Sequence, residues 1–200
     1  MTTPERTASI QRATAETSIE LTLNLDGSGT VHANTGVLFL DHMLHAFGRH
    51  AWLDIDITAN GDAAMDPHHT VEDTGIALGT AIRQALGDRI GIDRYGSAYA
   101  PLDEALARVV IDISGRPYFE LHGDMPEPVI GSDFATSLIE EFWRSCATNG
   151  GLTMHIDLLR SRNAHHAAEA IFKAAAVAFR SAIRSTGNAQ SIPSTKGVLA

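Results

Sequence analysis

Two blocks of histidine and glutamate are the residues of this chain best suited to chemistry. They share the pattern His-His-x-x-Glu, as His68, His69 and Glu72 and, 97 residues later, as His165, His166 and Glu169. Residues three or four apart lie on one face of a helix, so each glutamate can reach back beside its histidines. A single pair is commonly only a solvated helix face, but a second copy with the same glutamate favours metal binding. Because neighbouring helical residues point about 100° apart, the histidines of a pair diverge, and we expect them to serve two different ions.

One further side chain on each of two short helices extends the ligand set. His42 lies in a helix expected at residues 39–49, and Glu141 occupies a comparable place in a helix expected at residues 134–147. The candidate ligands suffice for two sites and are His42, His68, His69, Glu72, Glu141, His165, His166 and Glu169. Imidazole and carboxylate groups without thiolate suit manganese, iron or zinc, and open coordination positions would leave room for a substrate.

The long helices that carry the two blocks have recognisable ends. Asp66 is the expected cap of the first, with Pro67 at the first helical position, where its missing N–H is harmless; Asn163 is the expected cap of the second. Gly87 and Gly187 are the expected stops. Both blocks therefore lie in the first two turns of their helices.

The other elements repeat in the same order in both halves of the chain. Alternating apolar residues predict strands at residues 19–25, 52–58 and 152–158. A further strand is expected at residues 107–113, opening strands are placed at residues 8–14 and 97–101, and strands that return from turns are expected at residues 30–33 and 118–122. Turns at residues 26–29 and 114–117 are expected to return the chain as the third strand of each half. We therefore predict an α+β fold of two similar half-units, residues 1–92 and 93–200, each a four-stranded sheet with two helices on one face, packed helix to helix.

Composition excludes several classes of protein. The net charge of −9 and the lack of a basic stripe argue against a nucleic-acid binder. No apolar run approaches the ~20 residues of a membrane span, and the first residues lack the apolar core of a signal peptide. Cys146 is the only cysteine, so no intrachain disulfide forms, which fits the reducing cytoplasm where we expect this protein.

Positive charge gathers in three segments that would suit a phosphate group. The segments are Arg94-Tyr95-Gly96, Ser114-Gly115-Arg116-Pro117 and Pro193-Ser194-Thr195-Lys196-Gly197. Guanidinium and ammonium groups, together with hydroxyls and turn amides, are suitable phosphate ligands, although a single surface Arg or Lys is usually only solvated.

These three segments, the two His-His-x-x-Glu blocks, Leu40-Asp41-His42-Met43-Leu44 and Pro101-Leu102-Asp103-Glu104 occur in order along the chain. Together they resemble the imidazoleglycerol-phosphate dehydratases of histidine biosynthesis over essentially the whole sequence. The resemblance implies dehydration of D-erythro-imidazole-glycerol phosphate to imidazole-acetol phosphate by a hydro-lyase with two manganese ions per active site. It also implies self-association into a 24-subunit particle, with active sites between subunits.

The resemblance also assigns roles to individual residues. Phosphate contacts are expected from Arg94, Arg116, Ser194 and Lys196, and His50 matches a histidine near the substrate. Glu16 matches a glutamate of an N-terminal segment that reaches the active site, and catalytic roles are expected for Glu16, Glu169 and His42. One position departs from the family pattern, because many relatives have a histidine ligand where this chain has Glu141. A carboxylate can still bind manganese, so Glu141 stays a candidate ligand.

The expected reaction is demanding because the C–H bond that breaks is not beside a carbonyl, and the imidazole ring is its only electron sink. Metal ions on the ring nitrogens would act as Lewis acids, with Glu169 and Glu16 handling protons in an order that stays open. Two other functions stay open from the residues alone. A dinuclear metallohydrolase would release phosphate from an ester, whereas a non-catalytic metal-binding or shell-forming protein would need no phosphate pocket.

Overall fold

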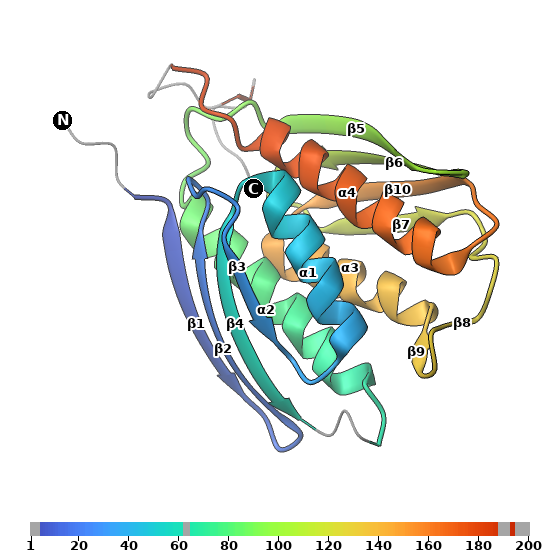
Figure 1. Cartoon of the computed structure of the whole chain (residues 1–200). Helices are drawn as coiled ribbons and strands as arrows, with labels where there is room; N and C mark the ends of the chain where they lie inside the picture. The colour runs from blue at the N-terminus through green and yellow to red at the C-terminus, as the bar shows by residue number, and fades with distance from the viewer. Residues whose placement is uncertain (1–4, 62–64, 188–192, 195–200) are drawn as a thin grey trace.

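The structure is a computed structural model that describes residues 5–61, 65–187 and 193–194. Apart from two short additional strands in the second half, its elements occur in the same order twice along the chain (Figure 1). The first series consists of β1 (Thr7–Ala13), β2 (Thr17–Asn24), β3 (Val31–Asn34), α1 (Leu38–Ala51), β4 (Asp54–Gly61) and α2 (His68–Leu86). The second consists of β5 (Tyr95–Leu102), β6 (Ala105–Asp112), β7 (Tyr118–His122), the short β8 (Val129–Ile130) and β9 (Phe134–Ala135), α3 (Ser137–Gly150), β10 (Thr153–Arg160) and α4 (Ala164–Ala182).

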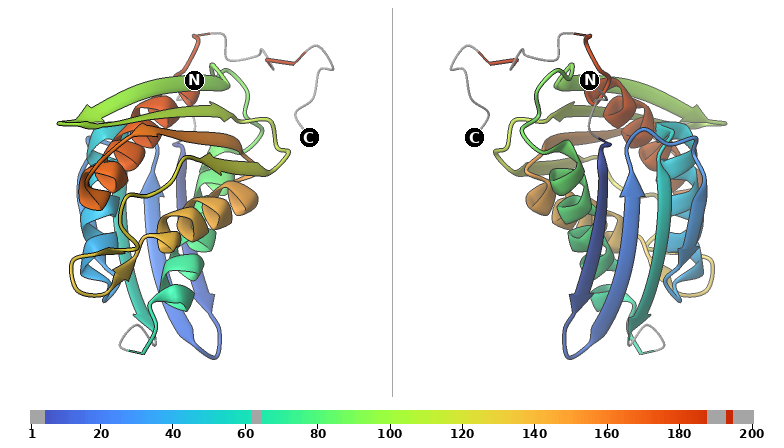
Figure 2. Two further views of the ribbon diagram at one scale, coloured as in Figure 1. Left: turned by 90° about the vertical axis from the view of Figure 1, so that its right-hand side faces the viewer. Right: turned by 90° about the vertical axis from the view of Figure 1, so that its left-hand side faces the viewer.

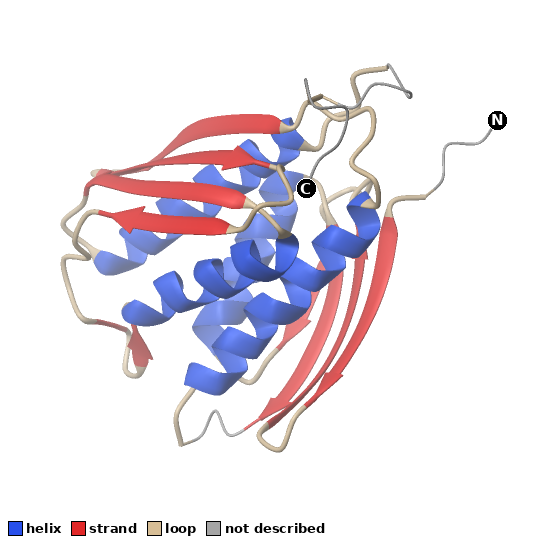
Figure 3. Ribbon diagram, turned by 180° about the vertical axis from the view of Figure 1, so that it is seen from behind, coloured by secondary structure: helices blue, strands red, loops and turns tan. Residues whose placement is uncertain are grey.

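The helices lie between two four-stranded sheets (Figure 3). The sheet orders are β1-β2-β4-β3 and β5-β6-β10-β7, and the strands of the two sheets run in crossed directions (Figure 2). Helices α1 and α2 cover the first sheet, and α3 and α4 cover the second. Helix α2 packs on α3, and α1 packs on α4. The predicted α+β fold of two similar units packed helix to helix is confirmed.

The core explains why these segments form these elements. Strand β2 buries Ile19, Leu21 and Leu23 and exposes the residues between them, as the alternating pattern predicts. The buried side chains of both sheets and all four of these helices form one continuous apolar cluster. Since the two units share a core, the boundary between residues 92 and 93 stays a prediction. No helix in the described part of the chain has the length and apolar character of a membrane span.

Two glycines bring α2 and α3 close together. A Cβ atom on Gly75 would lie 2.5 Å from the carbonyl oxygen of Phe142, and one on Gly79 would lie 2.3 Å from that of Cys146. Such distances leave no room for a side chain, so the two backbones approach as closely as they do only because both residues are glycine. The contact fixes α3 against the helix that carries His68.

The third strand of each unit pairs differently from a simple hairpin. The turns at residues 26–29 and 114–117 lead into β3 and β7 as expected, but β4 separates β3 from β2, and β10 separates β7 from β6. One Asp54 carboxylate oxygen accepts hydrogen bonds from the backbone N–H groups of Ser28 and Thr30, at 2.8 and 3.0 Å, which ties the first turn to β4. Strands β3 and β4 are therefore parallel, with α1 as their crossover.

Three helix limits differ from the sequence prediction or refine it. Helix α3 begins at Ser137 rather than at residue 134, because residues 134–135 pair with β8. Helix α4 ends at Ala182 and not at Gly187, because the chain beyond it forms a bridge with Ile92. Pro67 precedes the first residue of α2 instead of occupying it. The predicted cap of α4 is confirmed, since the Asn163 side chain accepts a hydrogen bond from the backbone of residue 166.

Candidate metal centre

Two clusters of potential metal ligands form where a short helix meets the first turns of a long one. The first joins His42 of α1 to two residues of α4, and the second joins Glu141 of α3 to two residues of α2. Their members are His42, His165 and Glu169 in the first and His68, Glu72 and Glu141 in the second. Within each cluster the potential ligand atoms all lie within 4.8 Å of one another.

The first cluster centres on the carboxylate of Glu169. Its Oε1 lies 3.1 Å from Nε2 of His42 and 3.0 Å from Nε2 of His165, and its Oε2 lies 2.5 Å from Nζ of Lys173. Burial would raise the pKa of Glu169, but hydrogen bonds from Lys173, His42 and His165 outweigh it and lower the pKa to about 2. The cluster therefore presents an ionised carboxylate between two imidazoles.

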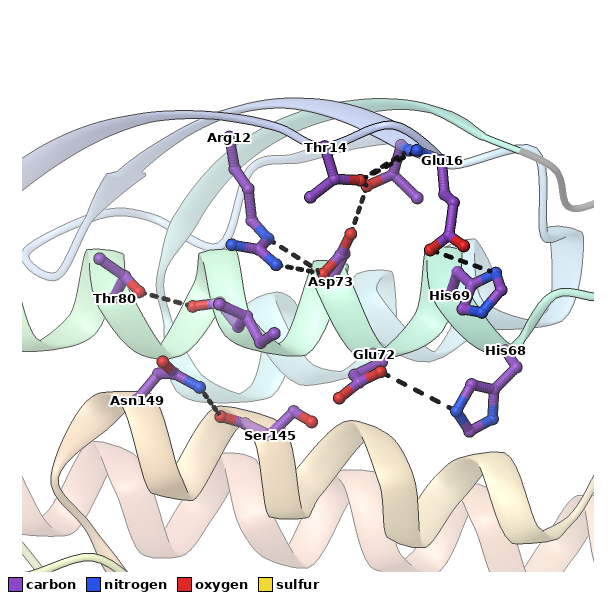
Figure 4. Close-up of polar contacts among 12 residues, drawn as sticks. Arg12, Thr14, Glu16, His68, His69, Glu72, Asp73, Thr80, Ser145 and Asn149 are labelled. Atoms are coloured by element: carbon purple, nitrogen blue, oxygen red, sulfur yellow. Dashed lines mark hydrogen bonds and ion pairs between the residues drawn. The ribbon is translucent and has the colours of Figure 1, made fainter.

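The second cluster repeats this arrangement with a carboxylate in place of one imidazole. Nε2 of His68 lies 3.9 Å from Oε2 of Glu72 (Figure 4), and Glu141 forms an ion pair with Arg144 on its own helix. Both α1 and α3 have 14 residues, and His42 and Glu141 are each the fifth. Glu141 thus occupies the place of His42 in the second unit, as the sequence comparison of the two halves predicts.

The second histidine of each pair points away from its cluster. The ring centroids of His68 and His69 are 5.8 Å apart with their planes inclined at 84°, and those of His165 and His166 are 6.3 Å apart with their planes inclined at 87°. This divergence agrees with the expectation from helix geometry. His69 and His166 are absent from both clusters that the described residues form.

Each of these outward histidines faces a carboxylate from a hairpin turn. Nδ1 of His69 lies 3.7 Å from Glu16 in the turn between β1 and β2 (Figure 4), and Nδ1 of His166 lies 2.8 Å from Glu104 in the turn between β5 and β6. The hydrogen bond with His166 is the main cause that lowers the pKa of Glu104 to about 2, and the same bond raises the pKa of His166.

The donor types of both clusters suit a first-row divalent metal, and three of the ligand separations allow a shared ion. Metal–ligand bonds of about 2.1 Å allow two ligand atoms of one ion to lie up to about 4.2 Å apart. The His42–Glu169, His165–Glu169 and His68–Glu72 distances all fall within this limit. Cys146 does not offer a thiolate ligand, since it is buried and burial raises its pKa to about 12. Imidazole and carboxylate donors suit manganese, iron or zinc.

Among the described residues expected to bind phosphate, Arg94 lies beside the last residue of α4, far from the first cluster. Arg94 is buried, and its guanidinium binds both carboxylate oxygens of Asp112 and donates to the carbonyl of Pro193 at 2.7 Å. It thereby holds the segment that carries Ser194. Arg116 is exposed, and its guanidinium has no polar partner among the described residues. Lys196 lies outside the described residues.

The lengths of α4 and of β10 show how far this phosphate region lies from the first cluster. The backbone N–H of Arg94 donates to the carbonyl of Ala182, 13 residues beyond Glu169 on α4, which is about 20 Å at 1.5 Å per residue. Thr153, the first residue of β10, donates to the carbonyl of Arg116, whereas α4 begins beyond the far end of that strand. An eight-residue strand spans about 25 Å.

His50 lies on the last turn of α1 and is exposed. Its backbone carbonyl accepts a hydrogen bond from Arg180 at 3.1 Å. Partial burial of the ring, and then the cations Lys173, Arg180 and Arg49, lower the pKa of His50, which favours the neutral imidazole.

Three contacts near the clusters were not predicted from the sequence, although Glu104 lies in one of the segments that carry the family resemblance. Lys173 has the helical i, i+4 spacing from Glu169, a signal that was available. Glu104 lies in the second hairpin turn at the place that Glu16 holds in the first. Asp73 accepts hydrogen bonds from Arg12 and Thr17 and so fastens the first hairpin to α2 (Figure 4). Long-range contacts of this last kind leave no local pattern in a sequence.

Comparison with known proteins agrees with the geometry. The model of the family described as imidazoleglycerol-phosphate dehydratase matches residues 35–179. The chain is 55% identical over 195 residues to the imidazoleglycerol-phosphate dehydratase of Thiobacillus denitrificans, covering 97% of this chain and 100% of the relative. It is 51% identical over 196 residues to that of Zymomonas mobilis, covering 98% and 100%.

Two solved structures share the fold. The imidazoleglycerol-phosphate dehydratase of Staphylococcus aureus superposes with a TM-score of 0.82 at 42% identity, covering 90% of this chain and 99% of the other. That of Pyrococcus furiosus, solved in complex with (S)-C348, superposes with a TM-score of 0.80 at 38% identity, covering 95% and 100%. The full-length match in sequence and fold shows that this chain belongs to the imidazoleglycerol-phosphate dehydratase family.

Proposed function

We propose that the two ligand clusters hold manganese ions with which this protein dehydrates D-erythro-imidazole-glycerol phosphate, and that each active site combines residues of more than one subunit. Membership of the family makes the chain a hydro-lyase of histidine biosynthesis, acting on a phosphorylated imidazole. This biosynthetic role supports a cytoplasmic location. The metal, the assembly and the residue roles are the parts that we propose.

The observation that carries the proposal is the separation of about 20 Å between Glu169 and the end of α4 where Arg94 lies. The imidazole and the phosphate of the substrate are joined by a three-carbon chain, which cannot bridge that distance. A substrate held by metal at its ring and by Arg94 or Arg116 at its phosphate therefore needs two copies of the chain. The outward-facing His69 and His166 support the same conclusion, because each offers a ligand to an ion on a neighbouring subunit.

We expect the particle to contain 24 subunits, as the family resemblance implies. The ligands would be His42, His165 and Glu169 for one ion and His68, Glu72 and Glu141 for the other, with His69 and His166 supplied by neighbours. Assembly then depends on metal, because ions would join the subunits. Ligation needs neutral imidazoles, so acid and chelators weaken the assembly together.

The side chains of the chain take distinct parts in the reaction. When bound, the metal supplies Lewis-acid stabilisation of negative charge on the imidazole ring. Arg94, Arg116, Ser194 and Lys196 hold the phosphate and so orient the reacting carbons, with His50 near the substrate. Glu16, whose side chain is 55% exposed, would move a proton to or from the substrate. Glu169 already contacts His42, His165 and Lys173, which supports a ligand role with proton transfer as a secondary one.

Metal removal tests the proposal. We expect chelation to abolish turnover and to reduce the particle seen by size-exclusion chromatography with light scattering, and manganese to restore both. Full activity after complete metal removal, verified by elemental analysis, would contradict the metal part. A protein that is monomeric and active with manganese would contradict the shared active site.

A further inference from the structure

We propose that Glu104 is a positioning residue that holds the Nδ1–H of His166 and so presents the Nε2 atom of that histidine for metal binding. This inference rests on the proposed function, because it assigns His166 to a metal site. Glu104 would touch neither metal nor substrate. It would act only through the ring of His166.

The contact is short and doubly anchored. Oε2 of Glu104 lies 2.8 Å from Nδ1 of His166, and its Oε1 accepts a hydrogen bond from the backbone N–H of Arg162 at 3.3 Å. Arg162 belongs to the segment that leads into α4, so the turn that carries Glu104 is fastened to the start of the same helix that carries His166. The Glu104 side chain is only 23% exposed.

The chemistry of the two groups fixes the tautomer. A carboxylate only accepts hydrogen bonds, so the ring proton of a neutral His166 must reside on Nδ1. Nε2 then keeps its lone pair and lies on the far side of the ring from Glu104. In metal sites, a carboxylate that accepts a hydrogen bond from one imidazole nitrogen fixes the tautomer and the orientation of the ring. The other nitrogen is then directed at the ion. His166 belongs to neither of the two clusters that the described residues form, and its side chain is partly exposed, so we infer that its Nε2 binds an ion of a neighbouring subunit.

The first hairpin provides an internal comparison. Glu16 and Glu104 each immediately precede the second strand of their hairpin, β2 at Thr17 and β6 at Ala105. The equivalent distance from Glu16 to Nδ1 of His69 is 3.7 Å, beyond hydrogen-bond range, and Glu16 is more than twice as exposed as Glu104. The two equivalent carboxylates have therefore diverged. Glu16 is left free to reach a substrate, whereas Glu104 is committed to a histidine.

Manganese retention tests the role of Glu104 without reference to activity. The manganese-loaded particle is dialysed against chelator buffers that set the free Mn²⁺ concentration, and bound manganese per chain is measured by elemental analysis. We expect Glu104→Ala to weaken one of two sites by about 10–100-fold and to leave the other unchanged. Glu104→Gln should lose less, because its amide oxygen still accepts from Nδ1–H.

Two controls separate positioning from a structural role. Glu120→Ala, which removes an exposed carboxylate bonded to Tyr118 in the same sheet, should leave both sites unchanged. The double variant Glu104→Ala/His166→Ala should bind manganese no more weakly than His166→Ala alone, because Glu104 acts only through His166.

Either of two results would overturn the role of Glu104. One is Glu104→Ala with both affinities within twofold of the unmodified protein, and the other is additive losses in the double variant. A failure of the metal sites themselves looks different, because the unmodified protein would then bind no manganese.

Discussion

A mixed-subunit experiment follows from the distance between the two halves of the proposed active site. Glu169→Gln impairs the metal end, and Arg116→Ala impairs the phosphate end, so each variant particle alone should have a much lower kcat/KM than the unmodified protein. If one site takes Glu169 from one subunit and Arg116 from another, a particle that contains both variants regains intact sites. With equal amounts of the two chains and random placement in a symmetric assembly, about a quarter of the sites are intact.

The expected recovery of activity in mixed particles depends on the distance between Glu169 and Arg116, which follows from the lengths of α4 and β10. Glu169 and the Ala182 end of α4 are about 20 Å apart, and Arg116 lies at the opposite end of β10 from the start of α4. No substrate with a three-carbon chain spans that distance, so intact sites within one chain are not expected. The measurement is kcat/KM of particles purified through two different tags, one on each co-expressed variant.

The shared active site would be refuted by a lack of recovery in the mixed particles. Doubly tagged particles with no more activity than the average of the two single-variant particles would show that Glu169 and Arg116 serve the same site from the same chain. Co-expression of two differently tagged copies of the Glu169→Gln chain controls for effects of the tags. It should show no recovery.

The remaining predictions concern single side chains. Glu141→Ala should lower manganese content and activity together, whereas Glu141→His should retain both, as measured by elemental analysis and turnover. Full manganese content in Glu141→Ala would show that Glu141 is not a ligand. Arg116→Ala should raise KM and cost about 1.5–3 kcal/mol in kcat/KM, because a charge-assisted phosphate contact is lost, with metal content intact. Backbone hydrogen bonds from Thr30 and Ser28 lower the pKa of Asp54, so its stabilising effect is present above the ordinary carboxyl pKa and is lost as pH falls through the lower native value. The difference in thermal midpoint between Asp54→Ala and the unmodified protein should therefore shrink from pH 6 towards pH 3; a constant difference would contradict this reasoning.

Local patterns made the elements predictable, because burial has the same period as the secondary structure. The alternation of Ile19, Leu21 and Leu23 indicates a half-buried strand, and Asn163 marks the start of α4 through its side-chain cap. The pairing of strands was harder to predict from the sequence, since β3 could have paired with β2 instead of β4. Asp54 binds the turn at Ser28 and Thr30, and that contact joins residues 24–26 positions apart.

The contacts of the candidate site also differ in whether they can be predicted from local sequence patterns. Helical spacing predicts the approach of His165 to Glu169 and the divergence of His166, because both follow from residues on one helix. The hydrogen bond between Glu104 and His166, which are 62 residues apart in sequence, depends on how a hairpin of the second sheet packs at the start of α4. No local pattern carries that information. The distance between Glu169 and Arg94, on which the shared active site depends, likewise requires the fold.

The most direct test of the account is the reaction itself. The manganese-loaded protein is incubated with D-erythro-imidazole-glycerol phosphate, and the products are identified by NMR and mass spectrometry. We expect loss of one water, appearance of the ketone imidazole-acetol phosphate and no inorganic phosphate, with no turnover after chelation. Release of inorganic phosphate would instead identify a metallohydrolase, and unchanged substrate in the presence of bound manganese would contradict the account.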